Sequence, residues 1–293
     1  METQKDKKLL GITCMVLASL CFSTGGLLIK LIPWNPLTIN GVRNLIACCI
    51  IGGYLLLTHH RLRFNLTILA GAFCLFGVTT LFSVANKLTT AGNAIVLQYT
   101  APVWVIWFMF LFFRQKPAKA EIMAIVIVLA GIACFFFDSL SSGRWLGDIC
   151  ALLAGIFYAG VFMLNQFEKG DAISSVFFGQ LLSGILLSPL AVSETDCSIR
   201  VLVPVLILGI VQVGLAYIFF TIGTRYTDPV TASVITAFEP ILNPVLVAIF
   251  YGEKLGRLSI LGAAIVICGI LLYNFRKAGK HPGVTEQAKD FHA

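Results

Sequence analysis

Apolar runs of roughly 20 residues recur along this chain from Leu9 almost to Phe275. A helix of that length crosses the ~30 Å hydrocarbon core of a lipid bilayer. Charged residues make up only 12% of the 293 residues, whereas soluble globular chains carry about 25%. We therefore expect an all-α protein that passes through the membrane many times.

Proline, glycine and charged clusters divide the chain into ten predicted transmembrane helices. These lie at residues 9–31, 37–57, 67–87, 92–113, 120–138, 145–166, 171–192, 200–224, 229–250 and 257–275. The first run is too long for the core of a signal peptide, so we expect it to be retained as a helix. Pro229 is expected to open the ninth helix, because proline suits the first helical turn.

The basic residues predict that both termini lie in the cytoplasm. Summed over alternate connections, fourteen Lys and Arg residues fall on the side of the N-terminus and six on the other. The positive-inside rule then places tails 1–8 and 276–293 on the cytoplasmic side of the cell membrane. The fourteen are Lys5, Lys7, Lys8, Arg61, Arg63, Arg114, Lys116, Lys119, Lys169, Arg225, Arg276, Lys277, Lys280 and Lys289, and the six are Lys30, Lys87, Arg144, Arg200, Lys254 and Arg257.

The two halves of the chain resemble each other. A shift of 138 residues aligns Pro102 with Pro240 and Gly131 with Gly269, and a shift of 136 aligns Gly11 with Gly147. The chain therefore reads as two repeats of five helices, residues 9–138 and 145–275. Because five is odd, the second repeat enters the membrane from the opposite side, which predicts an inverted-topology repeat.

Several short motifs resemble the drug/metabolite transporter superfamily, in its EamA-type branch with two five-helix repeats. They are Arg225-Tyr226-Thr227, Phe238-Glu239-Pro240, Gly252-Glu253-Lys254-Leu255, Gly262 and Gly269, with Lys87-Leu88-Thr89-Thr90, Pro102, Gly131 and Arg43 in the first half. One departure is Arg114-Gln115, where such proteins usually carry a Gly-Glu pair. The resemblance implies a carrier with a central cavity and, for many relatives, export of amino acids or other metabolites.

Polar residues inside the predicted helices are the candidates for a transport site, because polar groups in hydrocarbon are costly. We expect substrate to bind at Glu239, Gln98, Tyr99, Gln212, Tyr217, Asn243, Asn86, Tyr158 and Gln180. Pro102, Pro240 and Pro244 interrupt the fourth and ninth helices, which places the cavity around the third, fourth, eighth and ninth. Gln98, Tyr99, Gln212 and Tyr217 could instead form interhelical hydrogen bonds only.

Two charged residues are predicted deep in the membrane. At a rise of 1.5 Å per residue, Arg43 lies roughly 10 Å past Pro36 and Glu239 about 15 Å past Pro229. Three roles stay open for Glu239: a proton site, a contact to a cationic group on the substrate, or a structural partner of Arg43. By contrast, Lys30 and Asp148 are expected to reach the headgroup layer from the helix ends, where Trp34 and Trp145 act as aromatic anchors.

Other functions fit the sequence less well. A channel would explain polar residues but not the repeat, and an intramembrane enzyme would need a cluster of reactive groups. The four histidines lie in a loop and the C-terminal tail, and no Gly-Lys-Ser or Gly-Lys-Thr phosphate loop is present. We therefore expect no metal, no cofactor and no nucleic acid as partner. The expected partners are a small polar solute, the lipid bilayer and protons as a coupling ion. The expected oligomeric state is a monomer or a homodimer.

Overall fold

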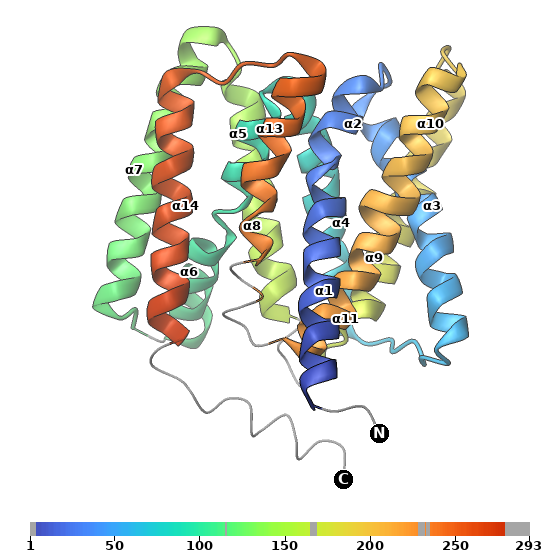
Figure 1. The fold of residues 1–293 in the computed structure, drawn as a ribbon, viewed down its shortest axis with the longest axis horizontal. Helices are drawn as coiled ribbons and strands as arrows, with labels where there is room; N and C mark the ends of the chain where they lie inside the picture. Colours follow the sequence, from blue (N-terminus) through green and yellow to red (C-terminus); the bar gives the residue numbers. More distant parts are fainter. Residues whose placement is uncertain (1–3, 115, 165–168, 228–231, 233–234, 279–293) are drawn as a thin grey trace.

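The computed structural model describes residues 4–114, 116–164, 169–227, 232 and 235–278. All regular secondary structure in these residues is helical (Figure 1). The first half contains α1 (Gln4–Ser23), α2 (Gly25–Leu31), α3 (Pro36–Leu57), α4 (Leu66–Leu88), α5 (Ala91–Gln98), α6 (Ala101–Phe113) and α7 (Lys119–Ser142). The second half contains α8 (Trp145–Leu164), α9 (Ala172–Leu187), the 3₁₀ helix η1 (Ser188–Ser193), α10 (Ile199–Ile207), the π-helix η2 (Leu208–Leu215), α11 (Ala216–Tyr226), α13 (Glu239–Tyr251) and α14 (Arg257–Ala278).

Eight helical stretches among the described residues are long and apolar enough to cross a membrane, and two shorter apolar helices follow, Glu239–Tyr251 and Arg257–Leu272. The predicted all-α membrane class is therefore confirmed. The predicted opening of the ninth helix at Pro229 lies outside the described residues. Helix α1 begins and α14 ends at the same end of the bundle (Figure 1).

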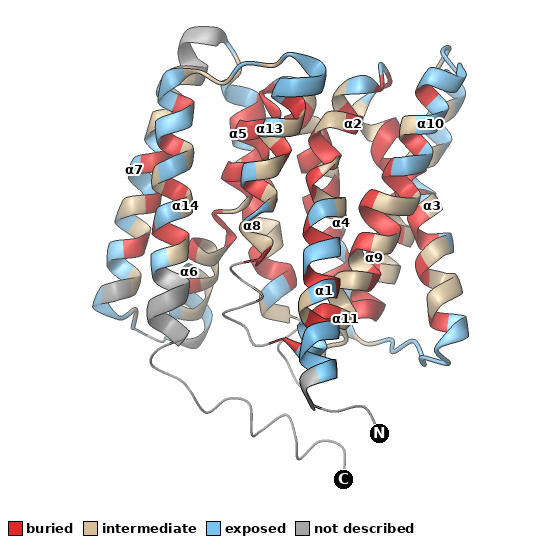
Figure 2. Ribbon diagram, viewed as in Figure 1, coloured by how far each residue is buried: buried red, intermediate tan, exposed pale blue. Residues whose placement is uncertain are grey.

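The distribution of polarity is the reverse of that in a soluble protein. Large apolar side chains such as Leu56, Phe110 and Phe250 are exposed on the outside, whereas polar side chains such as Asn40 and Asn93 are buried. Figure 2 shows the exposed positions on the outward faces of the outer helices and the buried ones facing the middle of the bundle. Lipid can solvate the apolar exterior, while interior polar groups such as the Asn40 amide, which donates to the Thr80 hydroxyl at 3.0 Å, find partners within the protein.

The fourth and ninth predicted helices are broken at matching positions. Two turn residues, Tyr99 and Thr100, separate α5 from α6, and Ala237 and Phe238 precede α13. Helices α6 and α13 are each 13 residues long and begin 138 positions apart. The breaks lie before Pro102 and Pro240, which occupy the first turn of the following helix. The helices break beside Pro102 and Pro240, each of which lacks the N–H that a continuous helix would donate to the carbonyl four residues earlier. Pro244, which was also expected to interrupt the ninth helix, instead lies inside α13.

Both 13-residue helices also end in the same way. Arg114, with φ of 53°, ends α6, and Gly252, with φ of 74°, ends α13. A left-handed residue after the last turn is a common helix stop, and glycine adopts it without steric cost. The backbones of the two halves therefore agree at the start and the end of these helices.

The halves also agree in how their helices pack. Helix α4 packs on α8, and α11 packs in the corresponding way on α1. Gly147 lies against the backbone of Leu88 and Thr89, and Gly11 lies against Tyr226 and Thr227. Helices α7 and α14 contact each other closely through Gly131 and Gly262.

Three expectations about the membrane interface were wrong. Trp34 is 6% exposed, and its indole N–H donates to the Asp196 carbonyl. Lys30 points inward to a carboxylate instead of reaching the headgroups. Asp148 is fully buried and accepts from the Thr89 hydroxyl at 2.7 Å. In each case a partner distant in the sequence satisfies the polar group.

Candidate functional site

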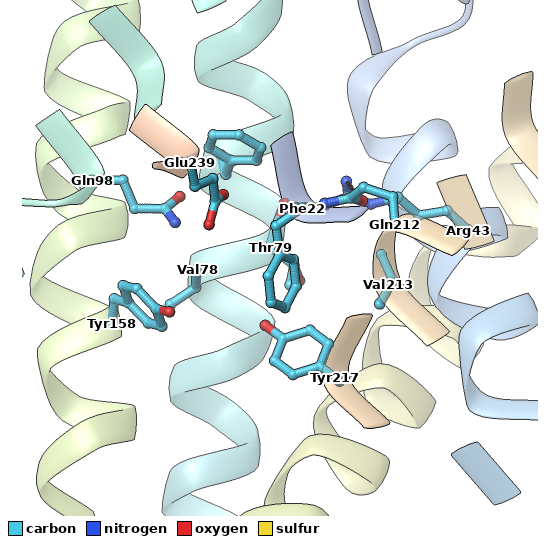
Figure 3. Close-up of a pocket in the computed structure, with 11 residues that line it drawn as sticks. Phe22, Arg43, Val78, Thr79, Gln98, Tyr158, Gln212, Val213, Tyr217 and Glu239 are labelled. Atoms are coloured by element: carbon cyan, nitrogen blue, oxygen red, sulfur yellow. Dashed lines mark hydrogen bonds between the residues drawn. The ribbon is translucent and has the colours of Figure 1, made fainter. Parts of the chain in front are cut away.

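A small cavity of about 50 Å³ lies between the two halves. It is lined by Phe22 of α1, Arg43 of α3, Val78, Thr79 and Phe82 of α4, Gln98 of α5, Tyr158 of α8, Gln212 and Val213 of η2, Tyr217 of α11 and Glu239 of α13. Figure 3 shows Gln98 and Glu239 on one side of this space and Arg43 and Gln212 on the other. The volume suits a small solute, since one water needs only about 10–15 Å³.

Arg43 is 2% exposed and is held by uncharged groups. Its Nε and Nη2 donate to Asn40 Oδ1 at 3.3 and 3.0 Å, its Nη2 also donates to the Thr79 carbonyl at 3.2 Å, and its Nη1 donates to Gln212 Oε1 at 3.3 Å. These are its hydrogen-bond partners in the described part of the chain. A guanidinium held in this way keeps its positive charge uncompensated, so the charge is available to an anionic group in the cavity.

The π-helix η2 and the glycine at the start of α2 together position the Gln212 side chain. Gln212 lies in the π-helix η2, the rare geometry that inserts one extra residue per turn and is common at functional sites. On the opposite side, a Cβ atom at Gly25 would come within 2.9 Å of the Gln212 amide nitrogen. Gly25 starts α2 directly after the helix turn at Thr24. The amide therefore reaches Arg43 because Gly25 leaves room for it.

Glu239 is the first residue of α13, directly after the break. A carboxylate is favoured there because the first turn of a helix presents unpaired N–H groups. The Tyr99 hydroxyl donates to Glu239 Oε2 at 2.6 Å. Beside it, the buried Gln98 Oε1 has no hydrogen-bond partner in the described structure. This side of the cavity therefore presents acceptors, whereas the Arg43 side presents donors.

The structure brings together most of the residues predicted for the site. Six line the cavity, namely Arg43, Gln98, Tyr158, Gln212, Tyr217 and Glu239, and Tyr99 lies behind Glu239. Asn86, Gln180 and Asn243 are buried but are not part of the wall. Asn86 donates to the Phe82 carbonyl of its own helix, and Asn243 lies against Gly26. Pro102 and Pro240 begin α6 and α13, and Pro244 lies inside α13.

Sequence reasoning missed five wall residues, Phe22, Val78, Thr79, Phe82 and Val213. The first, second and sixth predicted helices contribute to the wall as well as the third, fourth, eighth and ninth. The repeat contained a usable signal for two of the missed residues. Phe22 corresponds to Tyr158 at a shift of 136, and Thr79 corresponds to Tyr217 at a shift of 138. Equivalent positions in the two halves thus face the same cavity.

A second polar cluster ties elements together at the end of the bundle opposite the start of α1 (Figure 1). Lys30 Nζ lies 2.8 Å from Glu253 Oε1 and donates to the Thr89 carbonyl at 2.8 Å. Glu253 Oε2 accepts from the Ala91 N–H at 2.9 Å. The Lys87 ammonium donates to the Ile32 carbonyl nearby. This cluster joins the end of α2, the α4–α5 turn and the segment after α13.

Comparisons with known proteins agree with this architecture. The chain is 27% identical over 231 residues to the uncharacterized transporter YxxF of Bacillus subtilis (strain 168), which covers 76% of this chain and 74% of the relative. It is 29% identical to the uncharacterized transporter YwfM of the same organism, with 69% and 70% covered. A protein solved by crystallography shares the fold, with a TM-score of 0.61 at 17% identity over 93% of this chain and 98% of that chain.

The EamA-like transporter family matches the chain twice, at residues 9–137 and at residues 145–275. Together the two matches cover most of the 293 residues. The protein therefore belongs to the EamA-like transporter family.

Proposed function

We propose that this protein is a secondary transporter that exports a small zwitterionic, amino acid-like metabolite across the cell membrane. The observation that carries the proposal is the polarity of the cavity. An uncompensated guanidinium, Arg43, faces one side, while the carboxylate of Glu239 and the unpartnered carbonyl of Gln98 face the other. A solute with a carboxylate at one end and an ammonium at the other complements both sides.

The proposed mechanism is alternating access by two inverted five-helix repeats, residues 9–138 and 145–275, with both tails in the cytoplasm. The matching breaks before α6 and α13 support it, because transporters of this kind bind substrate where helices are interrupted in both halves. The polar cluster around Lys30 and Glu253 closes one end of the bundle in this arrangement. Protons are the proposed coupling ion, since Glu239 is the acidic residue in the cavity wall.

The test is counterflow in proteoliposomes with three forms of one amino acid: the zwitterion, its ester and its N-acetyl derivative. The ester lacks the carboxylate that Arg43 would bind, and the acetyl derivative lacks the ammonium that Glu239 would bind. We expect the zwitterion to compete at least about tenfold better than either, as one lost charge-assisted hydrogen bond predicts. Equal competition by all three would refute the substrate class.

Glu239→Gln separates the role of the acid from that of the cavity as a whole. The amide keeps the shape, so the variant should fold and should lose most of its preference for the zwitterion over the N-acetyl derivative. Flux that does not saturate and shows no counterflow would indicate a channel and would contradict the transporter proposal. Unchanged rate, affinity and pH dependence would remove Glu239 from both substrate binding and coupling.

A further inference from the structure

Asn243 of α13 is a buried polar residue that the cavity does not explain. Its side chain is fully buried, and neither its amide nitrogen nor its carbonyl oxygen has a hydrogen-bond partner in the described structure. A buried polar group that lacks a partner destabilises the fold. A carboxamide in this position therefore calls for a partner that it meets in another state of the protein.

Asn243 lies between the cavity and the ion pair of Lys30 with Glu253. It follows Glu239 of the cavity wall by one helical turn, so the two residues share a face of α13 and lie about 6 Å apart along its axis. On the facing helix α2, a Cβ atom at Gly26 would collide with Asn243 Oδ1. Gly26 in turn lies one turn before Lys30.

Helix α5 closes the same place from a third direction. A Cβ atom at Gly26 would also come within 3.0 Å of the Ala91 methyl carbon, and the Ala91 N–H donates to Glu253 Oε2 at 2.9 Å. Helices α2, α5 and α13 thus contact one another around Asn243 (Figure 1). The ion pair between Lys30 and Glu253 lies just beyond this contact, toward the end of the bundle.

A second unpartnered oxygen extends the cavity in the same direction. Val78 and Phe82 of the cavity wall lie one turn apart in α4, and Asn86 follows one turn later. The Asn86 carbonyl oxygen is buried and has no hydrogen-bond partner in the part of the chain that the structure describes. The next residue, Lys87, donates to the Ile32 carbonyl at the end of α2. Unpartnered polar groups on two helices therefore lead from the cavity to the end that α2 covers.

We propose that Asn243 is a second substrate contact, on a route from the cavity to the Lys30–Glu253 end that α2 covers in this structure. A turn at Thr24 separates α2 from α1, which makes α2 a distinct unit of seven residues. When α2 moves away, the carboxamide presents a donor and an acceptor side by side. Its N–H donates to the carboxylate of the zwitterion and its carbonyl accepts from the ammonium group, a chemistry that rests on the proposed function.

Accessibility of residue 243 tests the route without a transport assay. In a variant without the native cysteines, Asn243→Cys should react with an impermeant thiol reagent added from the Lys30 side of oriented proteoliposomes. Val128→Cys is the matched control, because Val128 of α7 is equally buried but packs against α14. We expect labelling at residue 243 to be at least about tenfold faster, since a route that opens exposes its lining more often than a permanent helix contact does. Equal rates would overturn the proposal.

Asn243→Leu tests the contact with the substrate. Leucine has a similar branched shape without polar atoms, so the unfolding temperature should stay or rise as the unpartnered amide is removed. Counterflow of the zwitterion should nevertheless slow at least about fivefold, as one lost hydrogen bond to a charged group predicts. Affinity of the central cavity, measured by thermal shift, should stay at the wild-type value. Wild-type counterflow would contradict the contact, and a joint loss of stability and affinity would show a structural role instead.

Thr227→Val is the matched control for this second variant. The Thr227 hydroxyl is also buried without a hydrogen-bond partner in the described structure and also lies against a glycine, Gly11. This pair lies toward the end of the bundle where α1 begins (Figure 1). Thr227→Val should leave counterflow unchanged. An equal loss in the two variants would refute a specific role for Asn243.

The two measurements separate this inference from the proposed function. Labelling of residue 243 in a protein without counterflow would leave the route standing and refute the proposed function, and with it the substrate contact. Counterflow in the wild type with no labelling of residue 243 would leave the transporter standing and refute the route. Should Asn243→Cys fail to fold, the counterflow of Asn243→Leu decides.

Discussion

Gly41→Ala should be one of the most damaging small substitutions in this protein. Gly41 lies in α3, where a Cβ atom would come within 2.3 Å of both the Leu187 carbonyl carbon and the Ser188 nitrogen. Both atoms belong to the backbone at the junction of α9 and η1. No rotation of a side chain can relieve this contact, so the two backbones must move apart.

The expected size follows from the distances. Ordinary van der Waals contact begins at 3.4 Å, so α3 and the α9–η1 junction must separate by roughly 1 Å, and overpacking of this kind costs about 1–3 kcal/mol or more. Arg43 lies two residues further along α3, and its hydrogen bond to Gln212 is already 3.3 Å long. Substrate affinity should therefore fall together with stability.

Thermal unfolding in detergent and substrate-dependent thermal shift measure the two effects. Gly53→Ala is the matched control, because Gly53 lies in the same helix and a Cβ atom there has nothing within 4 Å. We expect Gly41→Ala to lower the unfolding midpoint by roughly 5 °C or more and Gly53→Ala not to lower it. Equal unfolding midpoints for the two variants would show that Gly41 is not packed closely against the α9–η1 junction.

Two further predictions concern charged residues. Arg43→Lys should fold but bind substrate about tenfold more weakly, because a single ammonium cannot serve Asn40, Gln212 and a carboxylate together; a thermal-shift titration measures this, and wild-type affinity would contradict it. Glu253→Gln removes the charge that Lys30 binds, so this end of the bundle should open more often. The measurement uses a variant without the native cysteines and with one cysteine in place of Val213, which should be labelled faster by an impermeant thiol reagent added from the Lys30 side. Unchanged labelling would show that the ion pair does not close this end.

The helical class could be predicted from the sequence because hydrophobicity acts locally. A run such as Leu66–Leu88 is long and apolar enough to cross a membrane as a helix, whatever its neighbours are. That Arg43 and Glu239 face the interior cavity was predictable for a related reason: a charged side chain deep in a membrane is too costly to face lipid. Their presence in one cavity wall agrees with the reasoning, although the sequence alone left a direct pair between them open.

The partners of the polar residues could not be predicted, because they come from elsewhere in the chain. Lys30 and Glu253 are separated by 223 positions, and no local pattern indicates that they meet. Trp34 looks like an interface anchor until Asp196 is known to lie beside it. The π-helix at Leu208–Leu215 also could not be predicted, because one extra residue in an apolar helix leaves the hydrophobic pattern of the sequence nearly unchanged.

The likeness of the two halves explains why an acid and a phenol meet at the centre. Because both helices break at equivalent positions, the residues at one break lie against the residues at the other. Identical side chains would repeat the contact between Tyr99 and Glu239 as a second acid–phenol pair at positions 237 and 101. In this chain Ala101 occupies the position equivalent to Glu239, and Ala237 the one equivalent to Tyr99. The repeated backbone thus supplies the meeting point, and the difference between the halves allows one proton to be held there.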